Sequence, residues 1–140
     1  MERTTEFHDS ARRYYEACFG PESDRAKRYQ ALRDAEERDD QDTVEELRDA
    51  EADDVLSVEQ LTHGLRSSCQ WEILLTTGGP AARVVINIVD NEMVTWAEFQ
   101  YQDWFQSWYA PEGQDHDMLA DWADANFAIH SCRFCEEEGR

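Results

Sequence analysis

Residues 74–85 read LLTTGGPAARVV and place a glycine pair between two apolar stretches. Glycines beside threonines suggest a phosphate-binding loop, but such a loop leads into a helix whose N-terminal N–H groups hold the phosphate. Here the chain runs directly into ARVVINIV, residues 82–89, and the lysine and hydroxyl side chain of a phosphate loop are missing. Gly78 and Gly79 instead suit the positive φ angles of a tight turn, and Pro80 stiffens its exit. The segment therefore predicts a β-hairpin and no nucleotide site.

The sequence around this hairpin predicts further strands. WEILLTT, residues 71–77, alternates apolar and polar side chains, and MVTWAEFQYQ, residues 93–102, follows a short turn at 90–92. The connections are too short for crossover helices, so the three strands should form an antiparallel meander. VLSVEQLT, residues 55–62, is a candidate fourth strand.

Helical periodicity dominates the residues before the sheet. Apolar side chains from Phe7 to Phe19 recur at helical spacing, and Gly20-Pro21 ends that helix. Ser23 should cap a second helix that runs to about Arg38. Thr43-x-x-Glu46 matches a capping box for a third helix, whose inward side chains would be Val44, Leu47 and Ala50.

These elements predict one α+β domain. N-terminal helices would pack on a three- to four-stranded antiparallel meander sheet, and a C-terminal helix would span about 115–127. The chain of 140 residues fits a single domain. Its helical acidic part covers 1–54, its sheet 55–102, and its aromatic loop, helix and tail 103–140.

Charge is the strongest compositional signal. Thirty-two acidic residues face 13 basic ones, for a net charge of −19. Such a chain repels nucleic acid and anionic membranes and is attracted to basic proteins, especially those that bind nucleic acid. The polar N-terminus lacks an apolar signal region, and no apolar run approaches the ~18–20 residues of a membrane span. We therefore expect a soluble protein of the host-cell cytoplasm.

The acids concentrate in residues 34–54, which hold 12 acidic residues against Arg38 and Arg48. They coincide with helical periodicity, so we expect an ordered array of carboxylates. Such an array can imitate a nucleic-acid duplex, which carries about one charge per 1.7 Å of axis. The predicted partner contacts are Asp39, Asp40, Asp42, Glu45, Glu46, Asp49, Asp53 and Asp54, followed by Asp117, Asp121 and Asp124 on the outer face of the last helix.

Aromatic side chains are dense between residues 96 and 109. Phe99 and Tyr101 share a strand face with Ala97 and are predicted to be core residues. Trp104 and Trp108 follow the strand and would either wrap over the sheet edge or form an apolar anchor for a partner. Exposed aromatics would also suit a homodimer.

Metal and catalytic motifs are sparse. His130-x-Cys132-x-x-Cys135 is half of a zinc site, which Cys69 or His63 would have to complete. The alternative is a free thiol pair, and four cysteines do not suggest a disulfide scaffold. The spacing of the histidines assigns no catalytic triad. We therefore expect no enzyme activity and no cofactor, with zinc as the one metal to consider.

Three motifs carry a resemblance to other proteins. EILLTTGGPAARVV (72–85), EFQYQDWFQSWY (98–109) and LADWADANF (119–127) resemble a group of small acidic proteins from phages and mobile elements. The resemblance covers about residues 70–127. The aromatic-glycine ending usual in that group is replaced here by HSCRFCEEEGR, residues 130–140. The resemblance implies an accessory protein of a mobile element.

Charge and resemblance together predict a non-enzymatic inhibitor. It would dock acidic surfaces onto a basic nucleic-acid-binding protein, such as a CRISPR effector subunit or a restriction enzyme. Two alternatives stay open. One is a salt-adapted structural or oligomeric domain, because 12 of the 13 basic residues are arginine and 15 residues are aspartate. The other is a small zinc-binding accessory protein.

Overall fold

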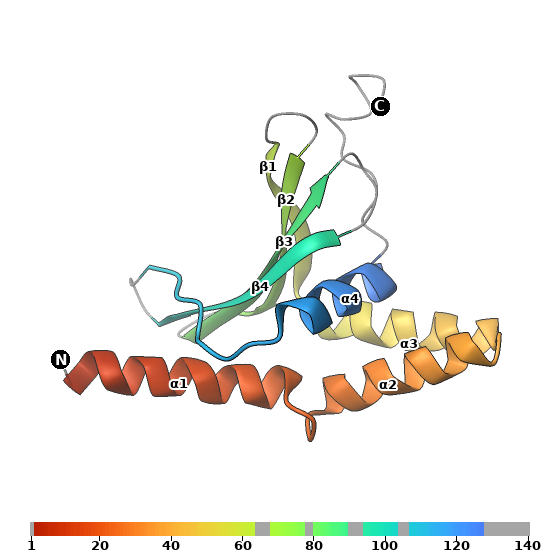
Figure 1. Cartoon of the computed structure of the whole chain (residues 1–140), viewed down its shortest axis with the longest axis horizontal. Helices are drawn as coiled ribbons and strands as arrows, with labels where there is room; N and C mark the ends of the chain where they lie inside the picture. The colour runs from red at the N-terminus through yellow and green to blue at the C-terminus, as the bar shows by residue number, and fades with distance from the viewer. Residues whose placement is uncertain (1, 64–67, 78–79, 90–93, 104–106, 128–140) are drawn as a thin grey trace.

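The computed structural model describes residues 2–63, 68–77, 80–89, 94–103 and 107–127. Along the chain they form α1 (Glu2–Phe19), α2 (Asp24–Glu37), α3 (Gln41–Asp54), β1 (Ser57–His63), β2 (Ser68–Thr76), β3 (Pro80–Val89), β4 (Val94–Asp103) and α4 (His116–Phe127). Three helices precede the sheet and one follows it, which confirms the predicted α+β class (Figure 1). Within these ranges no helix is long and apolar enough to cross a membrane.

The sheet is an antiparallel meander with the strand order β1-β2-β3-β4. The predicted hairpin is confirmed: β2 and β3 pair antiparallel, with Trp71 opposite Ile86 and Ile73 opposite Val84. Gly78 and Gly79 lie outside the described residues. The candidate strand at 55–62 is also confirmed, since β1 pairs antiparallel with β2.

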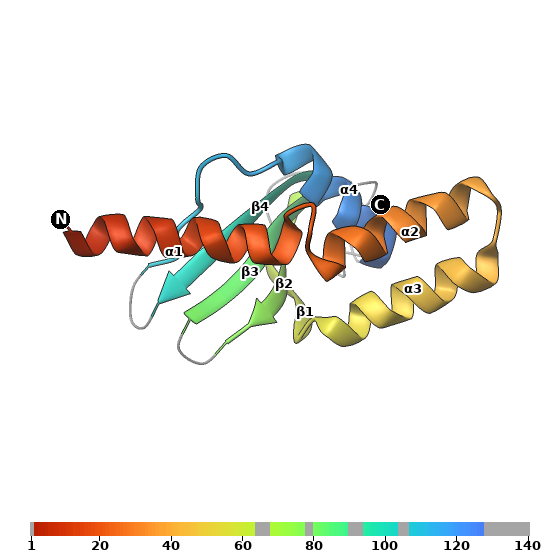
Figure 2. The same ribbon diagram turned by 90° about the horizontal axis from the view of Figure 1, so that it is seen from below.

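One face of the sheet forms the main core. Val84, Ile86 and Phe99 are fully buried there, under α1 and α4, which lie along this face (Figures 1 and 2). Phe19 of α1 makes edge-to-face contacts with Phe99 and with Trp122 of α4. Each such large apolar side chain contributes about 1.5–3 kcal/mol when it is removed from water, so this face accounts for most of the fold's stability.

The first two helices end and begin as the sequence predicts. The N–H of Gly20 donates to the Glu16 carbonyl at 2.7 Å, and a Cβ atom at position 20 would collide with that carbonyl. Ser23 Oγ accepts from the N–H of Ala26 at 3.0 Å and caps α2. Glycine is therefore required sterically at the end of α1.

The predicted start of α3 is wrong by three residues. Asp40, and not Thr43, is the N-cap, because its side chain accepts from the Thr43 N–H at 3.3 Å. The predicted inward position of Ala50 is also wrong: Ala50 is exposed, whereas Glu51 is fully buried. Position 50 lies about 120° around the helix from Val44, so it turns away from α2.

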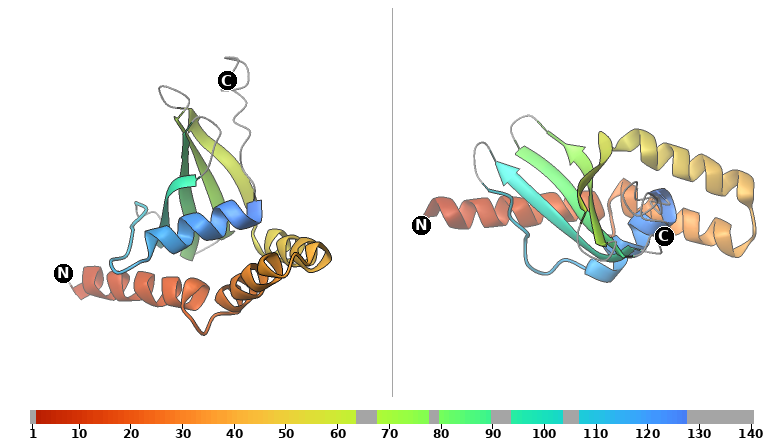
Figure 3. Two further views of the ribbon diagram at one scale, coloured as in Figure 1. Left: turned by 45° about the vertical axis from the view of Figure 1, so that its right-hand side comes forward. Right: turned by 90° about the horizontal axis from the view of Figure 1, so that it is seen from above.

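Helices α2 and α3 form an antiparallel helical hairpin that extends beyond the sheet (Figures 2 and 3). Its own apolar cluster is small and consists of the buried residues Leu32, Ala35 and Val44, with Tyr29, Leu47 and Ala125 packed against them. Ala125 belongs to α4, so the base of the helical hairpin rests on the last helix. The acidic segment is thus held on a separate projection of the domain.

Candidate functional site

The tip of the helical hairpin is an ordered acidic turn. Asp39 adopts a positive φ of 55°, which aspartate tolerates better than most residues. The Asp40 N–H donates to the Ala35 carbonyl at 3.0 Å. Hydrogen bonds from the hydroxyl and the N–H of Thr43 lower the pKa of the Asp40 carboxyl below its ordinary value. Asp39 is therefore an exposed carboxylate at the tip, and Asp40 has a structural role as a cap.

The inner side of the helical hairpin is held by two arginines and two carboxylates. Arg25 donates from Nε to Glu51 at 2.8 Å and from Nη2 to Asp54 at 2.9 Å. Arg28 Nη1 lies 3.1 Å from Glu51 and 3.3 Å from Asp54. Burial alone would lower the pKa of Arg28, but the attraction of Glu51 and Asp54 raises it. Asp54, a predicted partner contact, is thus engaged within the molecule.

This network was not predicted from the sequence, although a signal is present. Arg25 and Arg28 are three residues apart on α2, and Glu51 and Asp54 are three residues apart on α3. Residues at this spacing share one face of a helix. Two matched pairs of opposite charge on adjacent antiparallel helices indicate a clamp between them.

The outer side of α3 carries only carboxylates among its charged side chains. Asp42, Glu45, Glu46, Asp49 and Asp53 are all exposed. At 100° per residue they fall within about 100° of the helix circumference, opposite Val44 and Glu51. At 1.5 Å per residue, successive carboxylates are about 4 Å apart along the axis, close to the 3.4 Å per phosphate of one DNA strand. We call these five residues the α3 carboxylate face.

The one arginine of α3 points away from this face. Arg48 Nε donates to the Ala125 carbonyl of α4 at 2.8 Å, and its Nη2 lies 3.6 Å from Glu36 of α2. Arg48 therefore neutralises none of the α3 carboxylate face and instead ties α3 to both neighbouring helices.

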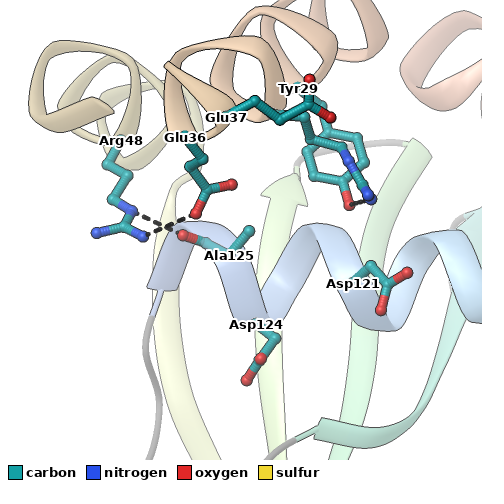
Figure 4. Close-up of a pocket in the computed structure, with 8 residues that line it drawn as sticks. Tyr29, Glu36, Glu37, Arg48, Asp121, Asp124 and Ala125 are labelled. Atoms are coloured by element: carbon teal, nitrogen blue, oxygen red, sulfur yellow. Dashed lines mark hydrogen bonds and ion pairs between the residues drawn. The ribbon is translucent and has the colours of Figure 1, made fainter. Parts of the chain in front are cut away.

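A polar groove of about 450 Å³ lies where α2, α3 and α4 meet (Figure 4). It is lined by Tyr29, Arg33, Glu36, Glu37, Arg48, Asp121, Asp124 and Ala125. Arg33 donates to the Tyr29 hydroxyl at 3.1 Å and lies over the Tyr29 ring. The groove mixes both signs of charge, so it is a less uniform acidic surface than the α3 carboxylate face.

The predicted acidic stripe on α4 is shorter than expected. Asp117 and Asp121 are exposed, but Asp124 is half-buried and its Oδ1 atom is enclosed. The residues predicted to face inward do so, since Leu119, Trp122 and Ala123 are fully buried. α4 therefore offers two exposed carboxylates, far fewer than α3.

Trp108, one of the two predicted aromatic anchors, folds back on the sheet. The Arg83 guanidinium lies 4.1 Å from the centre of its ring. Arg83 also donates to Glu72 at 2.7 Å and to Gln100 at 2.8 Å on the sheet face that the helices leave uncovered. Trp108 is thus held by an intramolecular cation–π contact, and Trp104 lies outside the described residues.

The candidate zinc ligands His130, Cys132 and Cys135 lie outside the described residues. Cys69, proposed to complete the site, is disulfide-bonded, with a partner that also lies outside them. A disulfide sulfur is not available as a thiolate ligand. Cys18 is free, and burial raises the pKa of its thiol. In the described ranges no group of three or more potential ligands could hold a metal ion.

The two described histidine side chains have structural contacts. The Nδ1 atom of His116 lies 2.8 Å from the Ala97 carbonyl, and its ring stacks on Trp96. The ring of His8 stacks on Tyr109 with centroids 4.3 Å apart. Both imidazoles therefore pack against the sheet or the segment that follows it.

No family model, curated protein or solved structure matches this chain. The resemblance to small acidic proteins of phages and mobile elements therefore stays a prediction.

Proposed function

We propose that this protein is a non-enzymatic inhibitor that docks the α3 carboxylate face onto a basic nucleic-acid-binding protein. An anti-CRISPR or anti-restriction role in a phage or mobile element is the sharpest form of this proposal. The five carboxylates would occupy the lysine- and arginine-lined channel that normally holds a nucleic-acid strand.

The main support is the segregation of charge around α3. Five exposed carboxylates share its outer side, while Arg48 and the partners of Glu51 lie on its inner side. A merely solvated helix of mixed composition would pair acids and bases along its exposed face. The axial spacing of about 4 Å also approaches that of phosphates along one strand.

Rigidity is the second support. The clamp of Arg25 and Arg28 on Glu51 and Asp54 holds one end of α3. The bond from Arg48 to Ala125 ties its middle to α4. Carboxylates on a preorganised helix lose little conformational entropy on binding. Their attraction to a basic partner should be fast and should weaken as salt rises.

An affinity capture from host lysate with two matched variants tests the proposal. The α3 variant carries Asp42→Asn, Glu45→Gln, Glu46→Gln, Asp49→Asn and Asp53→Asn. The distal variant carries Glu6→Gln, Asp9→Asn, Glu16→Gln, Glu22→Gln and Glu112→Gln, at exposed positions away from α3. Both have five fewer negative charges, so they separate the effect of position from that of net charge.

We expect wild type and the distal variant to capture the same nucleic-acid-binding protein at low salt and to release it in a salt step. The α3 variant should lose this capture while its circular dichroism spectrum is unchanged. Equal capture by both variants would exclude the α3 carboxylate face as the docking surface.

Salt adaptation without mimicry is the second candidate. It is favoured by exposed acids on α1, where Glu6, Asp9 and Glu16 lie far from α3 in sequence. This alternative predicts that the fold is lost when salt is removed, because repulsion between acids is then unscreened. A circular dichroism spectrum that is the same in molar salt and at low ionic strength would reject it.

A further inference from the structure

The two edges of the sheet are treated differently. Tyr109 pairs with Tyr101 at the β4 edge through hydrogen bonds of 2.7 and 2.8 Å. Gln114 completes this edge, because its side chain accepts from the Phe99 N–H at 2.6 Å and donates to the Phe99 carbonyl at 3.1 Å. The β4 edge is therefore covered by the chain itself.

The β1 edge has no such cover in the described part of the chain, where β1 pairs with β2 alone. Proteins commonly protect an open edge with lysine, proline or several charges. The sequence of β1, SVEQLTH, has one acidic residue, Glu59, and neither lysine nor proline. The edge thus retains the main-chain groups that a further strand would need.

Exposed leucines flank this edge. Leu56 is 57% exposed and Leu61 is 40% exposed, and two of the three exposed large apolar side chains in the described ranges are therefore at β1. Leu61 lies at an irregularity between Gln60 and Thr62, where the register with β2 shifts. The two leucines are separated by about 16 Å of extended chain, the length of a short strand.

The open edge is continuous with the α3 carboxylate face. Asp53 precedes Leu56 by three residues, and Glu59 lies between the two leucines. Figure 2 shows α3 and β1 along the same lower side of the molecule. An extended segment laid along β1 would therefore run beside carboxylates from α3.

We propose that the β1 edge binds an extended segment of the basic partner as a fifth strand. Main-chain hydrogen bonds would supply the pairing, Leu56 and Leu61 would contact its apolar side chains, and Asp53 and Glu59 would select lysine or arginine beside them. This inference rests on the proposed function and specifies how the partner docks.

Charge argues against a second copy of this chain as the occupant. Pairing two β1 edges about a two-fold axis would bring the acidic Glu59 side chains of both copies close together and would place two α3 carboxylate faces on one surface. Like charges across a strand pair are destabilising, and each chain carries a net charge of −19. A cationic strand removes this repulsion.

The probe is a peptide of about eight residues with alternating valine and arginine, the length that covers β1. Its control has the same arginines but two central prolines, which cannot donate to a strand. Amide exchange is followed by NMR on the full chain. We expect the alternating peptide to slow exchange at Ser57–Leu61 and to bind about tenfold more tightly than the proline peptide.

Equal binding of the two peptides, or changes confined to α3, would overturn strand addition. Two observations on the free protein would do so as well. Protection of β1 amides that rises with protein concentration would indicate a second copy at the edge. Protection that is complete at low concentration would indicate that another part of the chain covers it.

The leucines are tested with Leu56→Ser/Leu61→Ser, and Trp96→Ser is the control because Trp96 is the third exposed apolar side chain. We expect binding of the alternating peptide to weaken about tenfold in the leucine variant only. Unchanged binding would show that the leucines are not part of the site. Both variants are compared by circular dichroism, since the replaced side chains are exposed.

The same leucine variant separates this inference from the proposed function. If it captures the cellular partner as wild type does while the α3 variant fails, the acidic docking survives and the added strand is rejected. If neither variant loses capture, both proposals fail.

Discussion

The helical hairpin of α2 and α3 and the body formed by the sheet, α1 and α4 are stabilised in different ways. The body buries large apolar side chains, among them Phe99 and Trp122. The helical hairpin buries only Leu32, Ala35 and Val44 in a cluster of its own and adds the charged clamp of Arg25 and Glu51. The difference indicates that the body supplies the stability and the helical hairpin presents charge.

Replacing Trp122 with alanine should have the largest effect on this contrast. Trp122 is fully buried and contacts Phe19 and Phe127 edge to face. Loss of its volume should lower the free energy of unfolding by about 3–5 kcal/mol. Denaturant titration followed by far-UV circular dichroism measures the change. A loss below that of a surface replacement would mean that α4 is not part of the body.

Glu51→Gln should have the next largest effect. The amide keeps the shape of the side chain but removes the charge that two arginines face, so we expect a loss of about 2 kcal/mol. Glu59→Gln on β1 is the matched control and should change little, because Glu59 is exposed. The double change Arg25→Met/Glu51→Leu should recover most of the loss, since it leaves no unpaired buried charge. An equal loss for the two glutamines would contradict a specific clamp.

Asp40 predicts a smaller effect that depends on pH. Its carboxyl has a lowered pKa in the folded protein, so its stabilising contribution is complete above the ordinary aspartate pKa and is lost as pH falls through the lowered value. Asp40→Asn keeps an N-cap acceptor without this titration. Between about pH 5 and 2, wild type should therefore lose more stability than Asp40→Asn. Parallel loss in thermal melts of the two proteins would show that Asp40 does not contribute this dependence.

The sequence predicts the body better than it predicts the site. The alternation of Trp71, Ile73 and Leu75 and the turn residues at 78–80 specify strands and short connections, because period and turn chemistry are local. The helix limits at Gly20 and Ser23 follow from equally local rules.

Contacts between α2 and α3 depend on how the helices face one another, which one helical period does not give. Asp54 and Asp40 therefore have structural roles among the predicted contacts, while Asp42 and Asp49 are exposed. Trp108 was assigned to the sheet edge or to a partner, and only the three-dimensional arrangement places it over Arg83. Sequence spacing finds the carboxylates but does not separate those that bind internally from those that face solvent.

The most direct test of the account is competition for the captured partner between this protein and a labelled duplex. Release of the duplex is followed by fluorescence anisotropy at low salt, with the α3 variant and the distal variant in parallel. The account predicts that wild type and the distal variant release the duplex, and that the α3 variant needs about tenfold more protein or fails. Release by the α3 variant at wild-type concentrations, or no release by wild type, would contradict the claim that the α3 carboxylate face replaces nucleic acid.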